Sequence, residues 1–257
     1  MSPLPIILHH DQGTAGSARL TKIMALKGLA WGSCALTNWA ATDGPLSAIL
    51  AGAIGHPILQ KGSTFWVSSL AAIEALEELF PEPTLFPNGN RGMPLALSWW
   101  SDDLSEQTTV EQVAAHVTLI TRQLADGRDF LQGPAPGLAD AQAYAGLSVA
   151  WRNLEPSALP AETGQPVKGW FERVTSLGEG KRHEISAQEA RKEASSGKRI
   201  ASEAHLVAVS VFGGHSGFTI EGRDMNSSGN QISIAITEPD GAFAVHFPAI
   251  GYQATPV

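Results

Sequence analysis

The chain has 257 residues, of which 43% are hydrophobic and 16% are charged, a balance typical of a globular protein with a sizeable core. Its 25 acidic and 17 basic residues give a formal net charge of −8, which disfavours a nucleic acid or an anionic membrane as the partner. No apolar run approaches the roughly 20 residues that span a bilayer, and the lone Cys34 predicts a reducing compartment, which we take to be the cytoplasm.

The first eighty residues predict short strands and helices in alternation. A helix follows the Gly13 loop and stops at Gly28, and Pro45 stands at the first position of a second helix. In chain order the predicted elements are a strand over 5–10, a helix over 17–27, a strand over 29–36, a helix from 44, strands from 56 and over 64–66, and a helix over 69–79. This is the order of a thioredoxin-like domain, which we place at residues 1–81.

Three prolines between residues 81 and 87 predict a stiff, extended linker at a domain boundary. From 88 to 180 the pattern is that of an all-α bundle domain. One set of apolar residues recurs at three- and four-residue steps, as expected for a helix that faces a core: Val110, Val113, Val117, Ile120 and Leu124. Two further helices are predicted over 138–154 and 167–177.

The last part of the chain, 186–257, predicts a helix followed by an antiparallel sheet. Ser186 and Glu189 form a capping box at the start of a charged helix. Pro239-Asp240-Gly241 is a strong signal for a hairpin turn. The predicted strands lie over 206–212, 218–221, 231–236 and 242–247. We expect this small sheet to be attached to the helical domain.

Several spaced motifs together resemble those of bacterial and fungal glutathione S-transferase-like proteins that carry an extra β-rich C-terminal segment. These motifs are residues 8–10 (LHH), 26–31 (LKGLAW), 57–60 (PILQ), 80–87 (FPEPTLFP), 124–127 (LADG), 138–140 (LAD) and 246–248 (HFP). The resemblance covers nearly the whole chain. It implies an α/β thioredoxin-like domain that binds glutathione, an all-α bundle domain and a small C-terminal antiparallel β extension.

Glutathione chemistry requires a thiol that ionises near neutral pH, although a free thiol has a pKa of roughly 8.5. A hydroxyl donor at the positive end of a helix dipole favours the thiolate. The resemblance places Thr14 at the position of the family's usual catalytic serine or cysteine, and Ser17 lies one turn further on. Thr14 is therefore a candidate thiolate donor or only a helix cap, and Ser17 is a helix cap or a second catalytic candidate.

The resemblance also implies where the peptide part of glutathione binds. His56-Pro57 matches the family's cis-proline step, where the backbone of His56 would pair with the cysteinyl main chain; the alternative is an ordinary trans proline in a turn. Ser68-Ser69 matches an acidic residue followed by Ser or Thr at a helix start. Ser69 can hold the γ-glutamyl carboxylate, but Ser68 lacks the charge that pairs with the ammonium group, a loss of about 1.5–3 kcal/mol.

Three further residues are candidates for a substrate pocket. His10 lies near the Thr14 loop, and Trp99-Trp100 lies on the first helix of the bundle. The two tryptophans could equally form part of the core between helices. Because His9 and His10 are adjacent on a strand, their side chains point to opposite faces, and we predict no metal site there.

Asp140 and Cys34 are both interpreted as structural residues. Asp140 is predicted to cap a helix, with Gly137 in the place of the more usual Ser or Thr. Cys34, late in a predicted strand, is predicted to be a buried small apolar residue.

We therefore expect an enzyme of glutathione S-transferase type that acts on a hydrophobic electrophile in the cleft between the two main domains. The reaction would be conjugation, or glutathione-assisted isomerisation or elimination, because fold alone does not choose among them. One alternative is a non-catalytic binding or scaffold protein, which Ser68 favours. Another is a biosynthetic enzyme that uses the cleft without glutathione. Two-fold dimers are common among soluble proteins, and a homodimer is expected.

Overall fold

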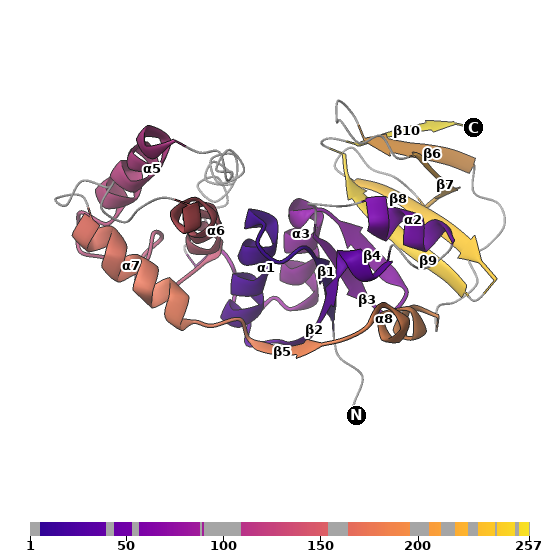
Figure 1. Ribbon diagram of the computed structural model, residues 1–257, viewed down its shortest axis with the longest axis horizontal. Coiled ribbons are helices and arrows are strands. Elements are labelled where there is room, and N and C mark those ends of the chain that lie inside the picture. Colours follow the sequence, from indigo (N-terminus) through magenta and orange to yellow (C-terminus); the bar gives the residue numbers. More distant parts are fainter. Residues whose placement is uncertain are drawn as a thin grey trace. The chain divides into compact units, whose positions relative to one another are not determined.

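The computed structural model describes residues 6–39, 44–52, 57–87, 89, 109–153, 164–195, 206–211, 219–225, 231–239, 241–249 and 252–256. The chain divides into two compact units, each built from segments that are distant in sequence (Figure 1). The first unit comprises residues 1–11, 30–76 and 182–257, and the second comprises 12–29 and 77–181. Within the described ranges no helix is long and apolar enough to cross a membrane.

The first unit is built on one mixed sheet. Its described strands are β1 (Ile7–His10), β2 (Ala30–Ala35), β3 (Ile58–Lys61), β4 (Thr64–Val67), β5 (Lys181–Glu184), β6 (Leu206–Val211), β7 (Thr219–Asp224), β8 (Gln231–Glu238), β9 (Gly241–Pro248) and β10 (Tyr252–Pro256). Their order is β10-β6-β7-β8-β9-β4-β3-β1-β2-β5. In the centre, β1 pairs with β2 in parallel and with β3 antiparallel, and β3 pairs antiparallel with β4. The thioredoxin-like arrangement predicted for the N-terminal part is confirmed.

The C-terminal strands continue this sheet. They pair antiparallel among themselves, as predicted, but β9 then pairs in parallel with β4, with Phe65 opposite Val245. The expectation that these strands are attached to the helical domain was therefore wrong. Without β9, strand β4 would be an edge with unpaired backbone groups, and pairing satisfies them.

One face of the sheet carries a shared hydrophobic core. Alternate residues of β4, β8 and β9 point to this face, as the two-residue period of a strand requires. They pack with residues from η1 (Leu36–Trp39), α2 (Pro45–Gly52) and α8 (Ala187–Ala194) (Figure 1). The core includes Phe65, Val67, Ile232, Ile234, Ile236, Phe243, Val245 and Phe247. Helix α3 (Ser69–Leu79) begins in the first unit, and its last three residues belong to the second.

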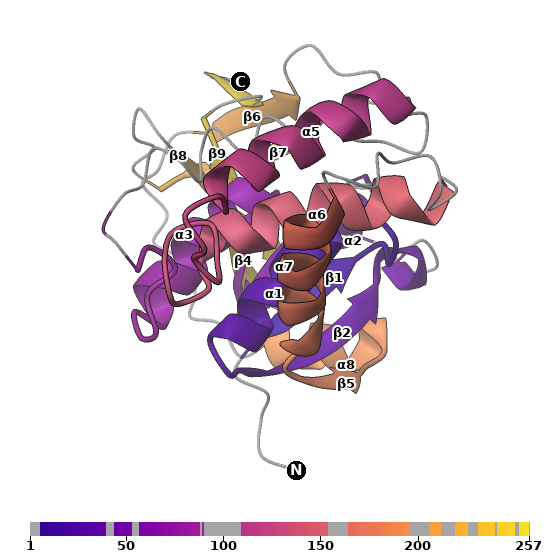
Figure 2. The ribbon, with the colours of Figure 1, turned by 90° about the vertical axis from the view of Figure 1, so that its left-hand side faces the viewer.

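The second unit is helical. Its described helices are α1 (Ala15–Leu26), α5 (Val110–Gln123), α6 (Leu138–Asn153) and α7 (Gly164–Ser176), shown together in Figure 2. Helix α1 packs along α6, and α7 contacts both α5 and α6. Thr109 and Gln112 form a capping box at the start of α5. The predicted apolar face of this helix is buried in the core of the unit at Val113, Val117, Ile120 and Leu124.

Asp140 fixes the start of α6, in agreement with the role predicted for it. Its buried carboxylate accepts hydrogen bonds from the backbone N–H groups of Leu131 and Gly137, both at 2.9 Å, and from Trp170 Nε1 at 2.7 Å. A Cβ at Gly137 would lie 2.8 Å from Pro87 Cδ and 2.9 Å from the Leu85 carbonyl. The absence of a Ser or Thr at this position follows, because the linker leaves no room for a side chain.

Candidate functional site

The start of α1 brings together the two hydroxyls proposed as thiolate donors. Thr14 is the N-cap, with an extended backbone, and its Oγ1 accepts a hydrogen bond from the Ser17 N–H at 3.2 Å. The same hydroxyl donates to Ser17 Oγ at 2.9 Å. The helix starts at Ala15 rather than Ser17 because Thr14 caps it. Thr14 is half-buried and Ser17 is only 3% exposed, so both hydroxyls lie close together at the start of the helix.

A cation from a distant part of the sequence lies against this loop. The Nη2 of Arg152, near the end of α6, donates to the Gly13 carbonyl at 2.5 Å, and its Nε donates to the Ser148 carbonyl at 3.2 Å. The described first turn of α1 contains no acidic residue. The positive end of the helix dipole and the guanidinium therefore reinforce one another beside Thr14. Sequence reasoning missed Arg152, because a lone arginine on a helix carries no local signal.

The start of α3 has a strained backbone. Ser68 has a φ of 83°, a conformation that costs a non-glycine residue about 1–3 kcal/mol and that clusters at functional sites. Its N–H donates to the Pro57 carbonyl at 3.1 Å, and its carbonyl accepts from the Ala72 N–H. The Ser68 Oγ is buried and has no hydrogen-bond partner among the described residues. A buried polar atom left without a partner requires an explanation, and a bound ligand is one.

Two of the predicted peptide-binding residues flank this serine. Ser69 is the first residue of α3, half-buried, and Pro57 directly precedes β3. His56 lies outside the described residues, and so does the predicted cis peptide bond between His56 and Pro57. Ser68, Ser69 and Pro57 belong to the first unit, whereas Thr14 and Ser17 belong to the second.

His9 is a structural residue of the sheet. Trp39 Nε1 donates to His9 Nδ1 at 3.1 Å, which makes Nε2 the protonated nitrogen, and Nε2 donates to Gln60 Oε1 at 2.7 Å. The Gln60 amide in turn donates to the Ala190 carbonyl of α8 at 2.9 Å. Burial lowers the pKa of His9 to about 4, so the imidazole is neutral at physiological pH.

His10 lies on the same strand with different partners. Its Nε2 is 3.0 Å from Ser33 Oγ, and its ring meets that of Trp31 edge-on. The imidazole is buried within the first unit. Trp99 and Trp100, the other pocket candidates, lie outside the described residues. Cys34 is fully buried, as predicted, and burial raises the pKa of its thiol to about 11, which keeps it protonated and unreactive.

Comparison with known proteins agrees with this architecture. No family model matches the chain, and no curated protein matches it in sequence. Among solved structures, a GST-like protein from Pseudomonas syringae is 23% identical, with a TM-score of 0.79, and the match covers 97% of this chain and 98% of that chain. That match is long enough to include the C-terminal strands.

Two other solved structures match less of the chain. A glutathione S-transferase from Rhodospirillum rubrum F11 is 21% identical with a TM-score of 0.54, over 66% of this chain and 88% of that chain. A maleylacetoacetate isomerase from Anaeromyxobacter dehalogenans 2CP-1, with bound dicarboxyethyl glutathione and citrate, is 19% identical with a TM-score of 0.50, over 74% of this chain and 98% of that chain. The chain therefore has the fold of glutathione S-transferase-like proteins.

Proposed function

We propose that this protein is a glutathione S-transferase-type enzyme. It would bind glutathione beside the hydrogen bond between the Ser68 N–H and the Pro57 carbonyl, which we call the Pro57–Ser68 step, and at the start of α3. The observation that carries the proposal is Ser68: its φ is 83°, its N–H is bonded to Pro57, and its buried Oγ has no partner among the described residues. These features fit a binding site in which the Ser68 hydroxyl forms a hydrogen bond to a ligand. The fold supports the proposal, since solved structures of this fold include one with a bound glutathione derivative.

The peptide part of the ligand would be held mainly by the backbone. At the start of α3, the N–H and hydroxyl of Ser69 would receive the γ-glutamyl carboxylate at the positive end of the helix dipole. The Ser68 hydroxyl would take a polar group beside it. The cysteinyl main chain would pair with the backbone at His56-Pro57, in the manner of an added strand.

The hydroxyls at the start of α1 would act on the thiol of glutathione. Glutathione supplies the sulfur nucleophile when it is bound. The hydrogen bond between Thr14 and Ser17 keeps the two hydroxyls together, and Thr14 or Ser17 would donate toward sulfur. The helix dipole and the Arg152 guanidinium both lower the free energy of an anion at this position, and so lower the pKa of the thiol.

The substrate class follows from what a thiolate attacks. We infer a hydrophobic electrophile that is conjugated, isomerised or cleaved with the help of glutathione, with His10, Trp99 and Trp100 kept as pocket candidates. The proposal also includes a cytoplasmic location, a homodimer, and the division into domains at 1–81, 88–180 and 186–257.

Titration with glutathione tests the proposal directly. Millimolar reduced glutathione should raise the melting temperature of the wild-type protein, and Ser69→Ala should weaken the effect about tenfold by removing one contact to a carboxylate. Thr118→Ala, which removes a hydroxyl bonded to a carbonyl within α5, is the matched control. If the wild-type protein shows no binding of glutathione by calorimetry and no thermal shift, the proposal is refuted.

A second candidate function is a binding or scaffold protein that retains the fold without catalysis. The serine at position 68, in place of an acidic residue, favours it, because the ammonium group of glutathione would then lack a charged partner there. A folded wild-type protein that binds no glutathione and turns over no aromatic halide or activated alkene electrophile would support this alternative.

A further inference from the structure

The start of α2 is held by side chains from the C-terminal part of the chain. Glu238, the last residue of β8, accepts a hydrogen bond from the Leu46 N–H at 2.6 Å through Oε1. Its Oε2 pairs with the guanidinium of Arg191 on α8. Arg191 also donates to Ser47 Oγ at 3.3 Å. The Glu238 side chain is only 2% exposed, so this contact is shielded from water.

Helix α2 lacks a cap of its own. Gly44, which precedes it, has no side chain, and Pro45 has no N–H, so that Leu46 bears the first N–H in need of an acceptor. Gly44 has a φ of +108°, and a Cβ there would lie 2.8 Å from the Glu238 Oε1. The glycine thus leaves space that the carboxylate occupies. The cap of α2 is supplied by a residue 192 positions away.

The same C-terminal part also holds strand β4. Strand β9 pairs with β4 up to the Trp66–His246 position, and the two rings stack with centroids 5.6 Å apart. Strand β4 ends at Val67, directly before Ser68, and α2 lies in the chain shortly before Pro57. The C-terminal part of the chain therefore contacts β4, which directly precedes Ser68, and α2, which precedes Pro57 in the sequence and is separated from it by residues 53–56, outside the described residues.

We propose that α8, β8 and β9 form a brace that sets the geometry of the Pro57–Ser68 step, with Glu238 and Arg191 as positioning residues. The part of this inference that concerns ligand affinity rests on the proposed function. The brace would act through the backbone, since Glu238 holds α2 and β9 holds β4. Loss of the brace would weaken the Pro57–Ser68 hydrogen bond and the binding of the peptide part of glutathione. The reaction at sulfur, which depends on α1, would be retained.

Amide hydrogen exchange tests the brace without any ligand. In Glu238→Gln, exchange at Leu46 and at Ser68 should become about tenfold faster, because a hydrogen bond to a charged group is replaced by a weaker neutral one. Glu184→Gln, in the exposed Arg182–Glu184 pair, is the control and should leave both amides unchanged. Exchange at Ser68 that is unchanged in Glu238→Gln would overturn the inference.

Kinetics with glutathione and an aromatic halide electrophile separate positioning from general destabilisation. The KM for glutathione should rise about tenfold in Glu238→Gln and in Arg191→Met, with kcat at saturating glutathione retained, and the double variant should be no worse than either single one. Faster Ser68 exchange with an unchanged KM would overturn the positioning role. If the wild-type protein binds no glutathione, the proposed function fails, and Ser68 exchange still decides whether the brace exists.

Discussion

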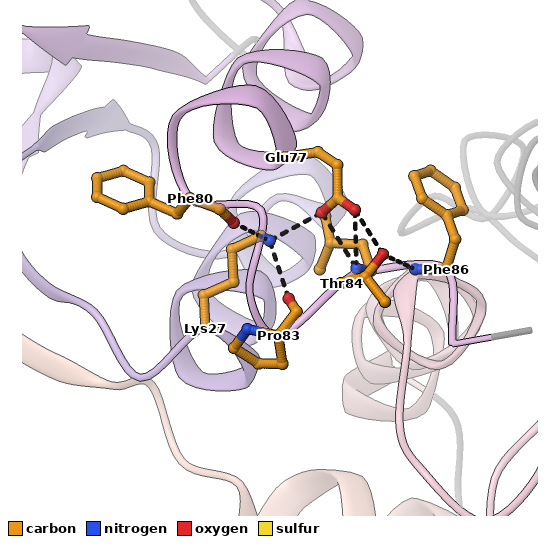
Figure 3. Close-up of polar contacts among 7 residues, drawn as sticks. Lys27, Glu77, Phe80, Pro83, Thr84 and Phe86 are labelled. Atoms are coloured by element: carbon orange, nitrogen blue, oxygen red, sulfur yellow. Dashed lines mark hydrogen bonds and ion pairs between the residues drawn. The ribbon is translucent and has the colours of Figure 1, made fainter. Parts of the chain in front are cut away.

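Lys27 and Glu77 form an ion pair that ties the end of α1 to the end of α3 (Figure 3). The Lys27 Nζ lies 2.8 Å from Glu77 Oε2, and it also donates to the carbonyls of Phe80 and Pro83 at 2.5 and 3.0 Å. The Glu77 carboxylate accepts from the Leu85 N–H and the Thr84 hydroxyl. The lysine side chain is fully buried, and its three acceptors match the three hydrogens of an ammonium group. This cluster holds the linker that follows α3.

Removing the Lys27 charge should destabilise the protein substantially. Lys27→Met would leave Glu77 and two carbonyls short of a partner, and breaking a buried pair in this way costs about 3 kcal/mol. Denaturant unfolding measures the change. Lys168→Met, in the exposed pair with Glu172, is the matched control and should have no measurable effect. Equal effects of the two substitutions would show that the buried cluster contributes nothing special.

Stability should fall with acidification because of His9. Its folded-state pKa, about 4, lies below the ordinary value of 6.5, so the unfolded chain binds a proton first as the pH falls. The stabilisation is complete above pH 6.5 and is lost between pH 6.5 and 4, by about 3 kcal/mol in total. The free energy of unfolding measured across this range should show a slope that His9→Gln removes. His183 is exposed, and His183→Gln should leave the slope unchanged. If His183→Gln removes the slope and His9→Gln does not, His9 is not its cause.

Gly137 should not accept a larger residue. Gly137→Ser would add a cap of the usual type, yet its Cβ would meet Pro87 and Leu85 at under 3 Å, and overpacking of this kind costs about 1–3 kcal/mol. Gly169→Ala, within α7, meets only the end of the Arg173 side chain at 3.3 Å and should be neutral or slightly stabilising. Thermal unfolding of the two variants gives the comparison. A Gly137→Ser protein as stable as the wild type would contradict the packing argument.

An acidic residue at position 68 should improve glutathione binding. Ser68→Glu would restore a charged partner for the ammonium group, and such a contact contributes about 1.5–3 kcal/mol, or roughly ten- to a hundredfold in Kd. Ser68→Gln has nearly the same size without the charge and is the control. Calorimetric titration of both variants with reduced glutathione measures the effect. Equal affinities of Ser68→Glu and Ser68→Gln would count against an ammonium subsite at this position.

The Arg152 guanidinium should lower the pKa of a bound thiol. In Arg152→Met, the thiol of bound glutathione should titrate about one pH unit higher, because a cation beside the site is lost. The ultraviolet absorbance of the thiolate, followed against pH, reports this value. Arg173→Met removes an equivalent contact, from a guanidinium to the Asp129 carbonyl, and should leave the titration unchanged. A shift of the same size in both variants would exclude a local effect of Arg152.

Much of the local structure could be predicted from the sequence. The caps at Ser186 and Asp140, the apolar face of α5 and the order of the first strands and helices all follow from short-range rules. The hydroxyls at Thr14 and Ser17 and the serine pair at 68–69 could be placed at helix starts for the same reason. The strain at Ser68 could not be predicted, because serine gives no signal for a positive φ.

The sequence by itself determined most of the helices and strands, because periodicity and capping act over a few residues, but it did not indicate β5 or β10 and placed the start of α1 at Ser17 instead of Ala15. Only the tertiary structure decided that β9 pairs with β4, that Glu238 caps α2, and that Arg152 lies against Gly13. These contacts join residues more than a hundred positions apart. Their formation depends on which exposed strand edge, uncapped helix start and carbonyl are close together in the folded chain, and no pattern of neighbouring residues carries that information.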